Sequence, residues 1–236
     1  MSTNMHGLSQ RVAIITGSTG NLGQTVARAF VDAGYRVAGI ARRASSSNSG
    51  SPSVFELSAD LLDVASIGAA VEKALERFRK IDVLVHLAGG FEGGKSIVEM
   101  DESALNRMLD INLRTAFNLF RVVVPHMRRQ GHGRVIAIGS RTAVEAARLT
   151  GAYGASKAAL VSLIRTLALE NADAGITANI VLPSTIDTAA NRAAMPDADP
   201  AKWIRPENIA DLVLWLASDA ASQTTGALIP IYGTEL

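Results

Sequence analysis

The sequence predicts an α/β fold: a doubly wound, mainly parallel sheet of about seven strands, flanked by helices on both faces. Short apolar runs alternate with amphipathic stretches along the chain. The runs are apolar at successive positions rather than at every second one, which is typical of strands buried on both faces. Strands that alternate with helices indicate right-handed βαβ units, and therefore a parallel sheet.

Each element follows from its own pattern. Apolar runs predict strands at 12–17, 36–41, 54–60, 81–89, 134–140, 177–183 and 227–233. Amphipathic spacing predicts helices at 22–33, 66–78, 102–127, 153–172 and 207–218. Three loops, 44–53, 89–96 and 188–205, follow predicted strand ends and should rim one crevice. The last of them is the expected substrate lid.

Composition excludes several classes of protein. The 236 residues predict one domain over 1–236. With 23 basic and 22 acidic residues the formal net charge is +1, which gives no general attraction to nucleic acid or an anionic membrane. No apolar run reaches the roughly 18 residues of a membrane span. Without cysteine or suitably spaced histidines we expect no metal site, and the N-terminus lacks a signal-peptide pattern, which predicts a cytoplasmic location.

Four polar side chains are candidate catalytic residues. Tyr153 and Lys157 lie four positions apart in a predicted helix, so they should face the same way. A phenol titrates near ~10, and a neighbouring cation favours the phenolate and lowers its pKa, which suits proton transfer to a substrate oxygen. Ser140 lies at a predicted strand end, where open α/β sheets bind ligands. Asn112 lies in the predicted helix 102–127.

The segment RVAIITGSTGNLGQTVARAF predicts a strand, a Gly-rich turn and a helix. This is the context of a dinucleotide-binding turn. Gly17 would allow the tight turn, and Gly23 would let the helix pack closely on the sheet. The N-terminus of that helix would then face a pyrophosphate.

Taken together, TGSTGNLG, Asn112, Ser140, Tyr153 and Lys157 resemble the short-chain dehydrogenase/reductase family, in its single-domain branch, over almost the whole chain. The resemblance implies a Rossmann-type fold and a nicotinamide cofactor. It implies that Tyr153 is the general acid/base and that Lys157 lowers its pKa and holds the nicotinamide ribose. It also implies that Ser140 binds the substrate oxygen and that Asn112 anchors a water that links Lys157 to solvent.

The same resemblance implies the cofactor contacts. The family pattern TGxxxGxG has glycine where this chain has Asn21, which we interpret as a variant because asparagine tolerates positive φ. The family segment NNAG is His86-Leu87-Ala88-Gly89 here. The implied cofactor-binding residues are Gly17, Thr19, Gly20, Asn21, Leu22, Gly23, Arg42, Asp60, Leu61, Ala88, Gly89, Tyr153, Lys157, Pro183, Ile186 and Thr188.

The end of the second predicted strand favours NADP(H) over NAD(H). An acid there would bind the ribose diol of NAD and repel a 2′-phosphate. Ala41 occupies this position and Arg42 follows it, and a guanidinium suits a phosphate. Two solvated arginines at a strand end are the alternative, so NAD(H) stays possible.

We therefore predict an enzyme that transfers a hydride between the nicotinamide and a small ketone or secondary alcohol. The segments GGFEGG and LPSTIDTAANRAAMPDADPAKW also resemble quinonoid dihydropteridine reductase, a specialised member of the family, so pterin reduction is an alternative. Met195 and Trp203 of the lid could stack on such a planar ring. A non-catalytic cofactor-binding sensor or scaffold ranks lower, because all four candidate catalytic residues are present.

The two long predicted helices carry apolar residues on more than one face. A helix that is apolar all round must be covered twice, by the sheet and by something else. Together with the resemblance, this predicts a homodimer or homotetramer. The residues concerned include Phe117, Phe120, Leu163, Leu167 and Leu169.

Overall fold

The computed structural model describes residues 10–43 and 54–234, so the predicted loop 44–53 lies outside the described residues. Within these ranges one seven-stranded sheet has the order β3-β2-β1-β4-β5-β6-β7, and every neighbouring pair is parallel. The predicted fold class is confirmed. The strands are β1 (Val12–Thr16), β2 (Arg36–Ala41), β3 (Val54–Ser58), β4 (Val83–His86), β5 (Gly133–Ile138), β6 (Ile176–Pro183) and β7 (Leu228–Ile231).

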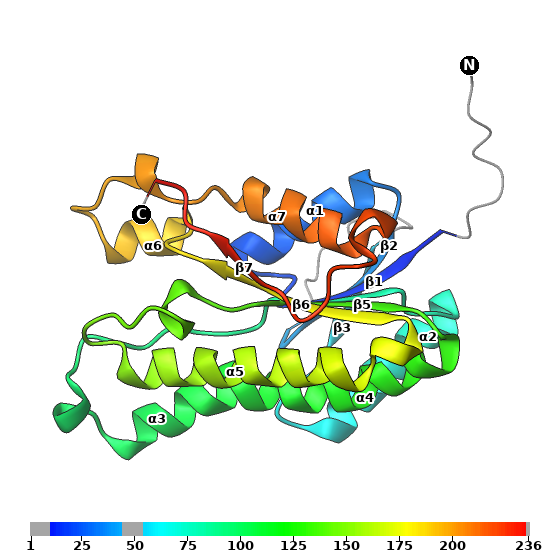
Figure 1. Ribbon diagram of the computed structural model, residues 1–236, viewed down its shortest axis with the longest axis horizontal. Coiled ribbons are helices and arrows are strands. Elements are labelled where there is room, and N and C mark those ends of the chain that lie inside the picture. Colours follow the sequence, from blue (N-terminus) through cyan, green and yellow to red (C-terminus); the bar gives the residue numbers. More distant parts are fainter. Residues whose placement is uncertain (1–9, 44–53, 235–236) are drawn as a thin grey trace.

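Helices cover both faces of the sheet (Figure 1). Helices α1 and α7 pack against each other on one face, and α2, α4 and α5 lie on the other, with α3 leading into α4. The helices are α1 (Asn21–Asp32), α2 (Val64–Phe78), α3 (Glu102–Leu109), α4 (Thr115–Gln130), α5 (Gly151–Glu170), α6 (Ala189–Ala194) and α7 (Pro206–Ala217).

The core consists of two apolar layers, because successive residues of a strand point to opposite faces. In β1, Ile14 joins the layer under α2, α4 and α5, whereas Ile15 joins the layer under α1 and α7. Both side chains are fully buried. Burial of such a side chain stabilises the fold by roughly 1.5–3 kcal/mol, and the apolar runs supply both layers at once.

Local signals set several helix ends. Asp63 caps α2 by accepting a hydrogen bond from the N–H of Ala65 at 2.9 Å, and Asp101 caps α3 through the N–H of Ala104 at 2.9 Å. Gly131 ends α4 in the left-handed conformation, with φ of +68°. These are the ordinary N-cap and C-cap devices, and each satisfies backbone groups that a helix end leaves free.

The predicted helix 102–127 is wrong in one respect. It is interrupted by a π-helical segment, Asp110–Arg114, between α3 and α4. Apolar spacing cannot reveal this, because one inserted residue shifts the hydrogen-bond ladder without changing which residues are apolar. Such single-turn π segments occur often at functional sites, and this one contains Asn112.

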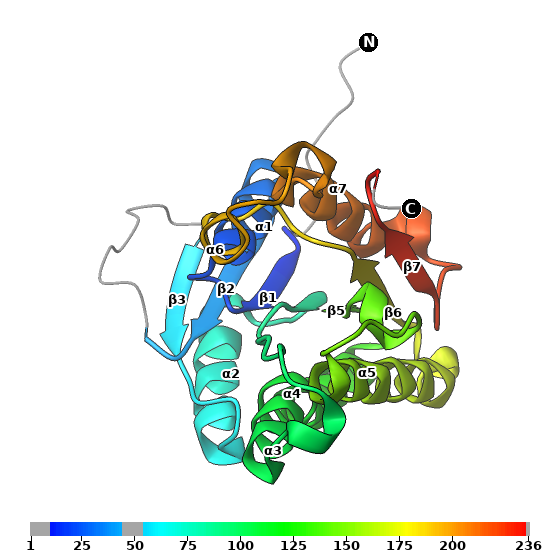
Figure 2. The ribbon, with the colours of Figure 1, turned by 90° about the vertical axis from the view of Figure 1, so that its left-hand side faces the viewer.

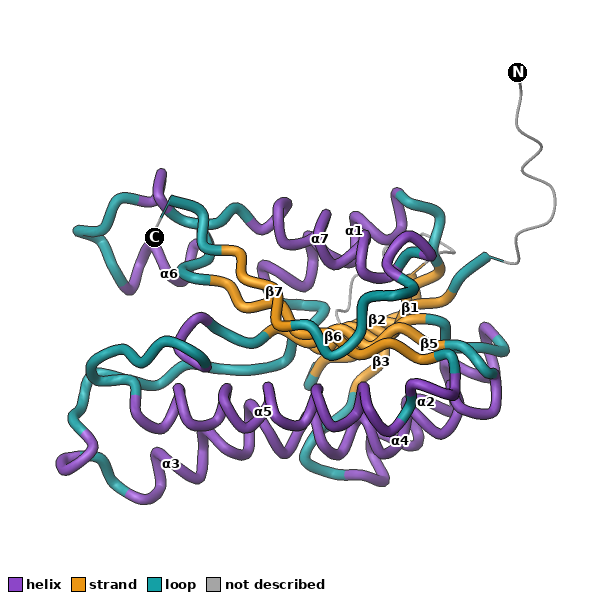
Figure 3. Tube along the Cα trace, viewed as in Figure 1, coloured by secondary structure: helices purple, strands orange, loops and turns teal. Residues whose placement is uncertain are grey.

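The strand order reverses between β1 and β4, which is where open α/β sheets bind ligands. Figure 2 shows the molecule from the side at which the strands end, with α6 above the sheet. The long connections after β4, β5 and β6 gather at this same end of the molecule (Figure 3). Among the described helices, none is both long and apolar enough to cross a bilayer.

Candidate active site

The Gly-rich turn joins β1 to α1 and depends on two glycines. Gly17 has φ of +69°, and its N–H donates to the carbonyl of Ile40 at 2.8 Å. A Cβ at Gly23 would lie 2.0 Å from the carbonyl oxygen of Gly17, so only glycine lets the helix approach the turn this closely. Both predicted roles agree with this geometry.

The helix begins at Asn21, with Gly20 as its N-cap. The expectation that Asn21 needs tolerance of positive φ is wrong, because Arg79 and Leu149 are the non-glycine residues with positive φ in the described part of the chain. Thr19, Gly20 and Asn21 are exposed at the turn. The turn thus presents the N-terminus of a twelve-residue helix to the crevice, and such an end attracts anions.

The end of β4 is tied to β1 by Thr16. Its hydroxyl oxygen lies 3.0 Å from Nδ1 of His86 and accepts hydrogen bonds from the N–H groups of Leu87 at 3.2 Å and Ala88 at 3.3 Å. Because this oxygen already accepts two bonds, its own proton goes to His86 Nδ1, which leaves Nε2 protonated. Burial, with a smaller effect from the charge of Lys157, lowers the pKa of His86 to about 3, so its ring is neutral.

Asn112 is fully buried and holds the loop after β4. Its Oδ1 accepts from the N–H of Gly90 at 3.0 Å, and its Nδ2 donates to the carbonyl of Gly90 at 3.0 Å and to Oγ of Ser156 at 3.1 Å. A Cβ at Gly89 would lie 2.8 Å from Oδ1 of Asn112 and 3.3 Å from Nζ of Lys157. The π turn therefore brings Asn112, the Gly89-Gly90 loop and Lys157 together.

Tyr153 and Lys157 share one face of α5, as predicted. The Nζ of Lys157 lies 5.9 Å from the ring centroid of Tyr153 and donates to the carbonyl of Ile138 at 3.0 Å. The hydroxyl of Ser140 lies near enough to the phenol of Tyr153 to act on its pKa. Ser140 lies two residues beyond the end of β5, and its Oγ accepts from the N–H of Thr142 at 3.2 Å and lies 2.9 Å from Oγ1 of Thr142. Three of the four candidate catalytic side chains thus meet at the end of β5, and Asn112 joins them through Gly89.

The expected lowering of the Tyr153 pKa is wrong for this structure. Burial raises the pKa of the phenol, and the hydrogen bond from Ser140 opposes this only in part. The ammonium of Lys157 bonds the Ile138 carbonyl rather than the phenol, so it gives the phenolate little support. Burial also lowers the pKa of Lys157 from 10.5 to about 8. Both shifts follow from desolvation, which disfavours the charged form of each group.

The segment after β6, which was predicted to be the lid, contains the short helix α6. Pro183 ends β6, the hydroxyl of Thr188 caps α6 through the N–H of Asn191 at 3.2 Å, and Ile186 forms a parallel bridge with Ile204. Trp203 is 6% exposed and packs into the protein, so the expectation that it could stack on a ligand is wrong. The bridge anchors both ends of 188–205 beside the sheet.

The residues predicted to contact the adenosine half of the cofactor lie on separate segments of the chain. Arg42 is exposed just beyond β2. Asp60 is exposed as well, and its Oδ1 accepts from the N–H of Leu62 at 2.9 Å. The carbonyl of Leu61 accepts from the side-chain amide of Asn118 at 3.2 Å, which fixes this loop against α4. Leu22 is half-buried at the start of α1.

Sequence reasoning missed two residues next to the candidate site. Phe91 packs edge-on against Tyr153 with ring centroids 4.9 Å apart, yet it is 66% exposed. The single aromatic in GGFEGG was the signal that could have found it. Ser156 accepts from Asn112 and donates to the carbonyl of Tyr153 at 2.7 Å, which links the π turn to α5. No sequence signal singles out this serine.

Comparisons with known proteins identify the family. Residues 11–199 match the family model for short chain dehydrogenases. The 3-oxoacyl-acyl-carrier-protein reductase FabG of Escherichia coli is 30% identical over 239 residues, which cover 94% of this chain and 96% of that protein. D-beta-hydroxybutyrate dehydrogenase of Rhizobium meliloti is 29% identical over 254 residues, which cover 94% of this chain and 97% of that one.

A solved structure supports the same family. A short-chain type dehydrogenase/reductase from Mycobacterium ulcerans has a TM-score of 0.89 and 26% identity, and the match covers 95% of this chain and 89% of the other. The chain therefore belongs to the short-chain dehydrogenase/reductase family. It is an oxidoreductase of this nicotinamide-dependent family.

Proposed function

We propose that the chain is an NADP(H)-dependent carbonyl reductase that interconverts a ketone and a secondary alcohol. One observation supports it most strongly. The hydroxyls of Ser140 and Tyr153 lie close together beyond the end of β5, and Lys157 is buried one helical turn from Tyr153. A carbonyl oxygen placed between these two hydroxyls would meet two hydroxyl donors at once.

The residues of the turn fit a dinucleotide. Gly17 and Gly23 let the turn approach Ala88 and α1 closely, because a Cβ at either position would meet backbone atoms, and the N-terminus of α1 supplies free N–H groups for a pyrophosphate. When bound, the nicotinamide supplies a hydride to the carbonyl carbon, or takes it from the alcohol. We assign the cofactor to Gly17, Thr19, Gly20, Asn21, Leu22 and Gly23, with the ribose next to Tyr153 and Lys157. Arg42 favours the 2′-phosphate of NADP(H).

Tyr153 donates the proton in the reduction. Its raised pKa keeps the phenol protonated at neutral pH, which is the form needed to protonate the substrate oxygen. Ser140 hydrogen-bonds the same oxygen and orients the carbonyl. Lys157 carries a positive charge below its pKa of about 8 and donates to the carbonyl of Ile138, and its proposed role is to hold the nicotinamide ribose.

Exposed apolar side chains support a homo-oligomer. A groove on α4 and α5 is lined by Leu109, Leu113, Phe117 and Leu163. Phe117 is 44% exposed and Leu169 is 83% exposed, and both were expected to need a second cover. A second copy of the chain is the proposed cover, as a homodimer or homotetramer.

A substrate screen tests the proposed function. Purified protein is mixed with NADPH or NADH and a panel of ketones, diketones and a quinonoid dihydropterin, and absorbance at 340 nm is followed. Turnover of ketones with NADPH is expected. Turnover of the dihydropterin alone would favour the pterin alternative, and binding of NADPH without any turnover would favour a sensor.

The variant Tyr153→Phe tests the acid. We expect turnover to fall by about 10²-fold or more, the usual contribution of a positioned general acid, while the dissociation constant of NADPH changes less than about threefold. Tyr35→Phe makes the same chemical change at a phenol that contacts the carbonyl of Ala217, away from the candidate site, and serves as the control. Normal turnover by Tyr153→Phe would contradict the assigned role.

A further inference from the structure

A carboxylate reaches the dinucleotide turn from the edge strand of the sheet. Glu56 lies in β3 opposite Gly39 of β2. A Cβ at Gly39 would lie 2.7 and 2.8 Å from the two carboxylate oxygens of Glu56, and 2.8 Å from Oγ of Ser18. The carboxylate therefore fills the space above β2 that any larger residue at position 39 would take.

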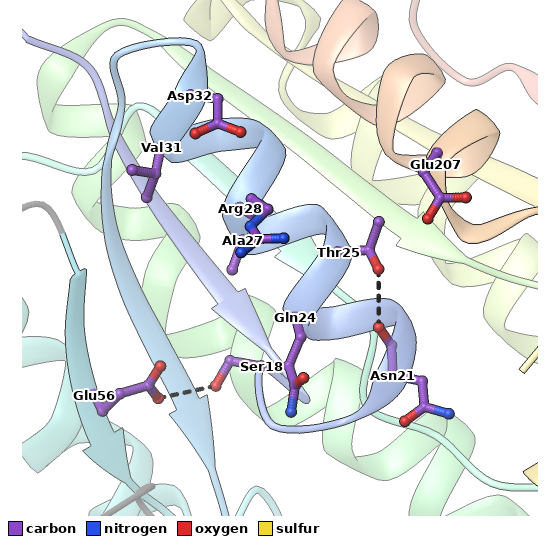
Figure 4. Close-up of a pocket in the computed structure, with 10 residues that line it drawn as sticks. All are labelled: Ser18, Asn21, Gln24, Thr25, Ala27, Arg28, Val31, Asp32, Glu56 and Glu207. Carbon is purple, nitrogen blue, oxygen red and sulfur yellow. Dashed lines mark hydrogen bonds between the residues drawn. The ribbon is translucent and has the colours of Figure 1, made fainter. Parts of the chain in front are cut away.

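Ser18 connects this carboxylate to the turn. It follows Gly17 directly, is 3% exposed, and donates a hydrogen bond to Oε2 of Glu56 at 3.1 Å (Figure 4). Figure 4 shows Glu56 extending from β3 across β2 toward Ser18, beside the first turn of α1. Ser18, Asn21 and Glu56 line one groove, which continues along α1 to Asp32.

The position of Glu56 bears on the adenosine end of a dinucleotide. Gly39 and Ala41 face the same side of β2, because alternate residues of a strand do so, and they are about 6.6 Å apart along it. Ala41 occupies the place at which an acid would bind a ribose diol and repel a 2′-phosphate. β2 has no acid at this place, but Glu56 of β3 puts a carboxylate next to the turn, about one strand repeat from Ala41.

The charge of Glu56 is not cancelled by the nearby arginines. In the described part of the chain no ion pair joins Glu56 to Arg28, which lines the same groove, or to Arg42, which follows β2. Ser18 is its hydrogen-bond partner there, and this bond leaves the carboxylate oxygens able to accept further bonds. Within the described residues the groove therefore holds an unpaired negative charge beside the turn, and the cation of Arg42 lies outside it, just beyond β2.

We propose that Glu56 is a cofactor-selectivity residue. It accepts hydrogen bonds from a ribose diol and repels a 2′-phosphate. Its effect on cofactor binding is therefore opposite to that of Arg42, and it reduces the difference in affinity between NADP(H) and NAD(H). This inference rests on the proposed function. It deepens that proposal, because it predicts that both cofactors bind and that removal of a single charge makes the protein strongly selective.

The test measures binding rather than turnover. Dissociation constants of wild type and Glu56→Gln are determined by calorimetry for adenosine 5′-monophosphate, adenosine 2′,5′-bisphosphate, NADH and NADPH. The first two probes differ only in the 2′-phosphate. Glutamine keeps an oxygen that can accept from Ser18, so the variant removes the charge and keeps the tie to the turn. Asp32→Asn is the matched control, since it removes one negative charge from the far end of the same groove.

We expect Glu56→Gln to tighten NADPH and adenosine 2′,5′-bisphosphate by about five- to tenfold, the scale of one unit charge acting over a short, partly solvated distance. NADH should weaken up to about threefold, and Asp32→Asn should leave all four constants within about twofold because of distance and screening. An equal effect of both variants would overturn this inference without affecting the proposed function. So would an unchanged ratio of the dissociation constants of NADPH and NADH. A wild type that binds neither dinucleotide would overturn the proposed function as well.

Discussion

A methyl group at Gly23 should damage both the fold and the dinucleotide turn. In Gly23→Ala the new Cβ would lie 2.0 Å from the carbonyl oxygen of Gly17, 2.8 Å from its carbonyl carbon and 2.9 Å from Cα of Ser18. All three atoms belong to the backbone, so no side chain can move aside. Relief requires α1 to shift away from the turn by roughly 1 Å, and overpacking of this kind costs typically about 1–3 kcal/mol.

We therefore expect the free energy of unfolding to fall by about 3 kcal/mol, the upper end of that range, because backbone yields less than side chains do. For a chain of this length that corresponds to a fall in Tm of roughly 6–12 °C. Urea unfolding followed by circular dichroism measures the loss. Wild type and variant are compared at one protein concentration, because association of copies would contribute to the apparent stability.

The control is Gly68→Ala, which has the opposite expected sign. Gly68 lies inside α2, and a Cβ there would meet no atom within 4 Å. Alanine is the better helix former, so the same chemical change should stabilise the protein by about 0.5–1 kcal/mol. If Gly23→Ala lost less than about 1 kcal/mol, or if both variants moved in the same direction, the account of the turn would be wrong.

Two further predictions concern charge. Arg42→Ala should weaken NADPH by about tenfold and NADH by less than about twofold in fluorescence titration, because only NADPH carries a 2′-phosphate; equal losses would move cofactor choice elsewhere. In Lys157→Met the pH dependence of stability should change, because burial lowers the folded-state pKa of Lys157 to about 8 and its unfolded value stays near 10.5. The cost of the buried charge is fully present below about pH 8 and is relieved as pH rises toward 10.5. Between pH 7 and 9.5 the wild type should thus gain roughly 2 kcal/mol relative to the variant in urea unfolding, and parallel curves would contradict the assigned pKa.

A single cause, desolvation, shifts the pKa values of Tyr153 and Lys157 in opposite directions. Desolvation acts against the phenolate and against the ammonium alike. The sequence spacing of four indicates that the two groups share a helix face, but it contains no information about how deeply that face is buried. The direction of the Tyr153 pKa in this structure is therefore set by packing rather than by its partner in sequence.

Patterns that depend on neighbours in the chain were predicted well. The parallel sheet of about seven strands and the helices on both faces follow from apolar runs, and the structure confirms them. The glycines of the turn follow from local backbone geometry, with which the structure agrees. Ser140 was predicted to share a site with Tyr153, and in the structure it lies near enough to act on the pKa of the phenol. These features are short-range, or they repeat in a fold whose connections follow strict rules.

Contacts between segments that are distant in the sequence were decided by the tertiary structure alone. The amide of Asn112 bonds Gly90 and Ser156 in a π turn that apolar spacing cannot show. Glu56 reaches Ser18 only because β3 pairs with β2 in the register that places it opposite Gly39. The sequence by itself determined the scaffold and most of the reacting groups, since those depend on local pattern. The register between strands and the depth of burial decided which charge faces the turn and which protonation state each buried group prefers.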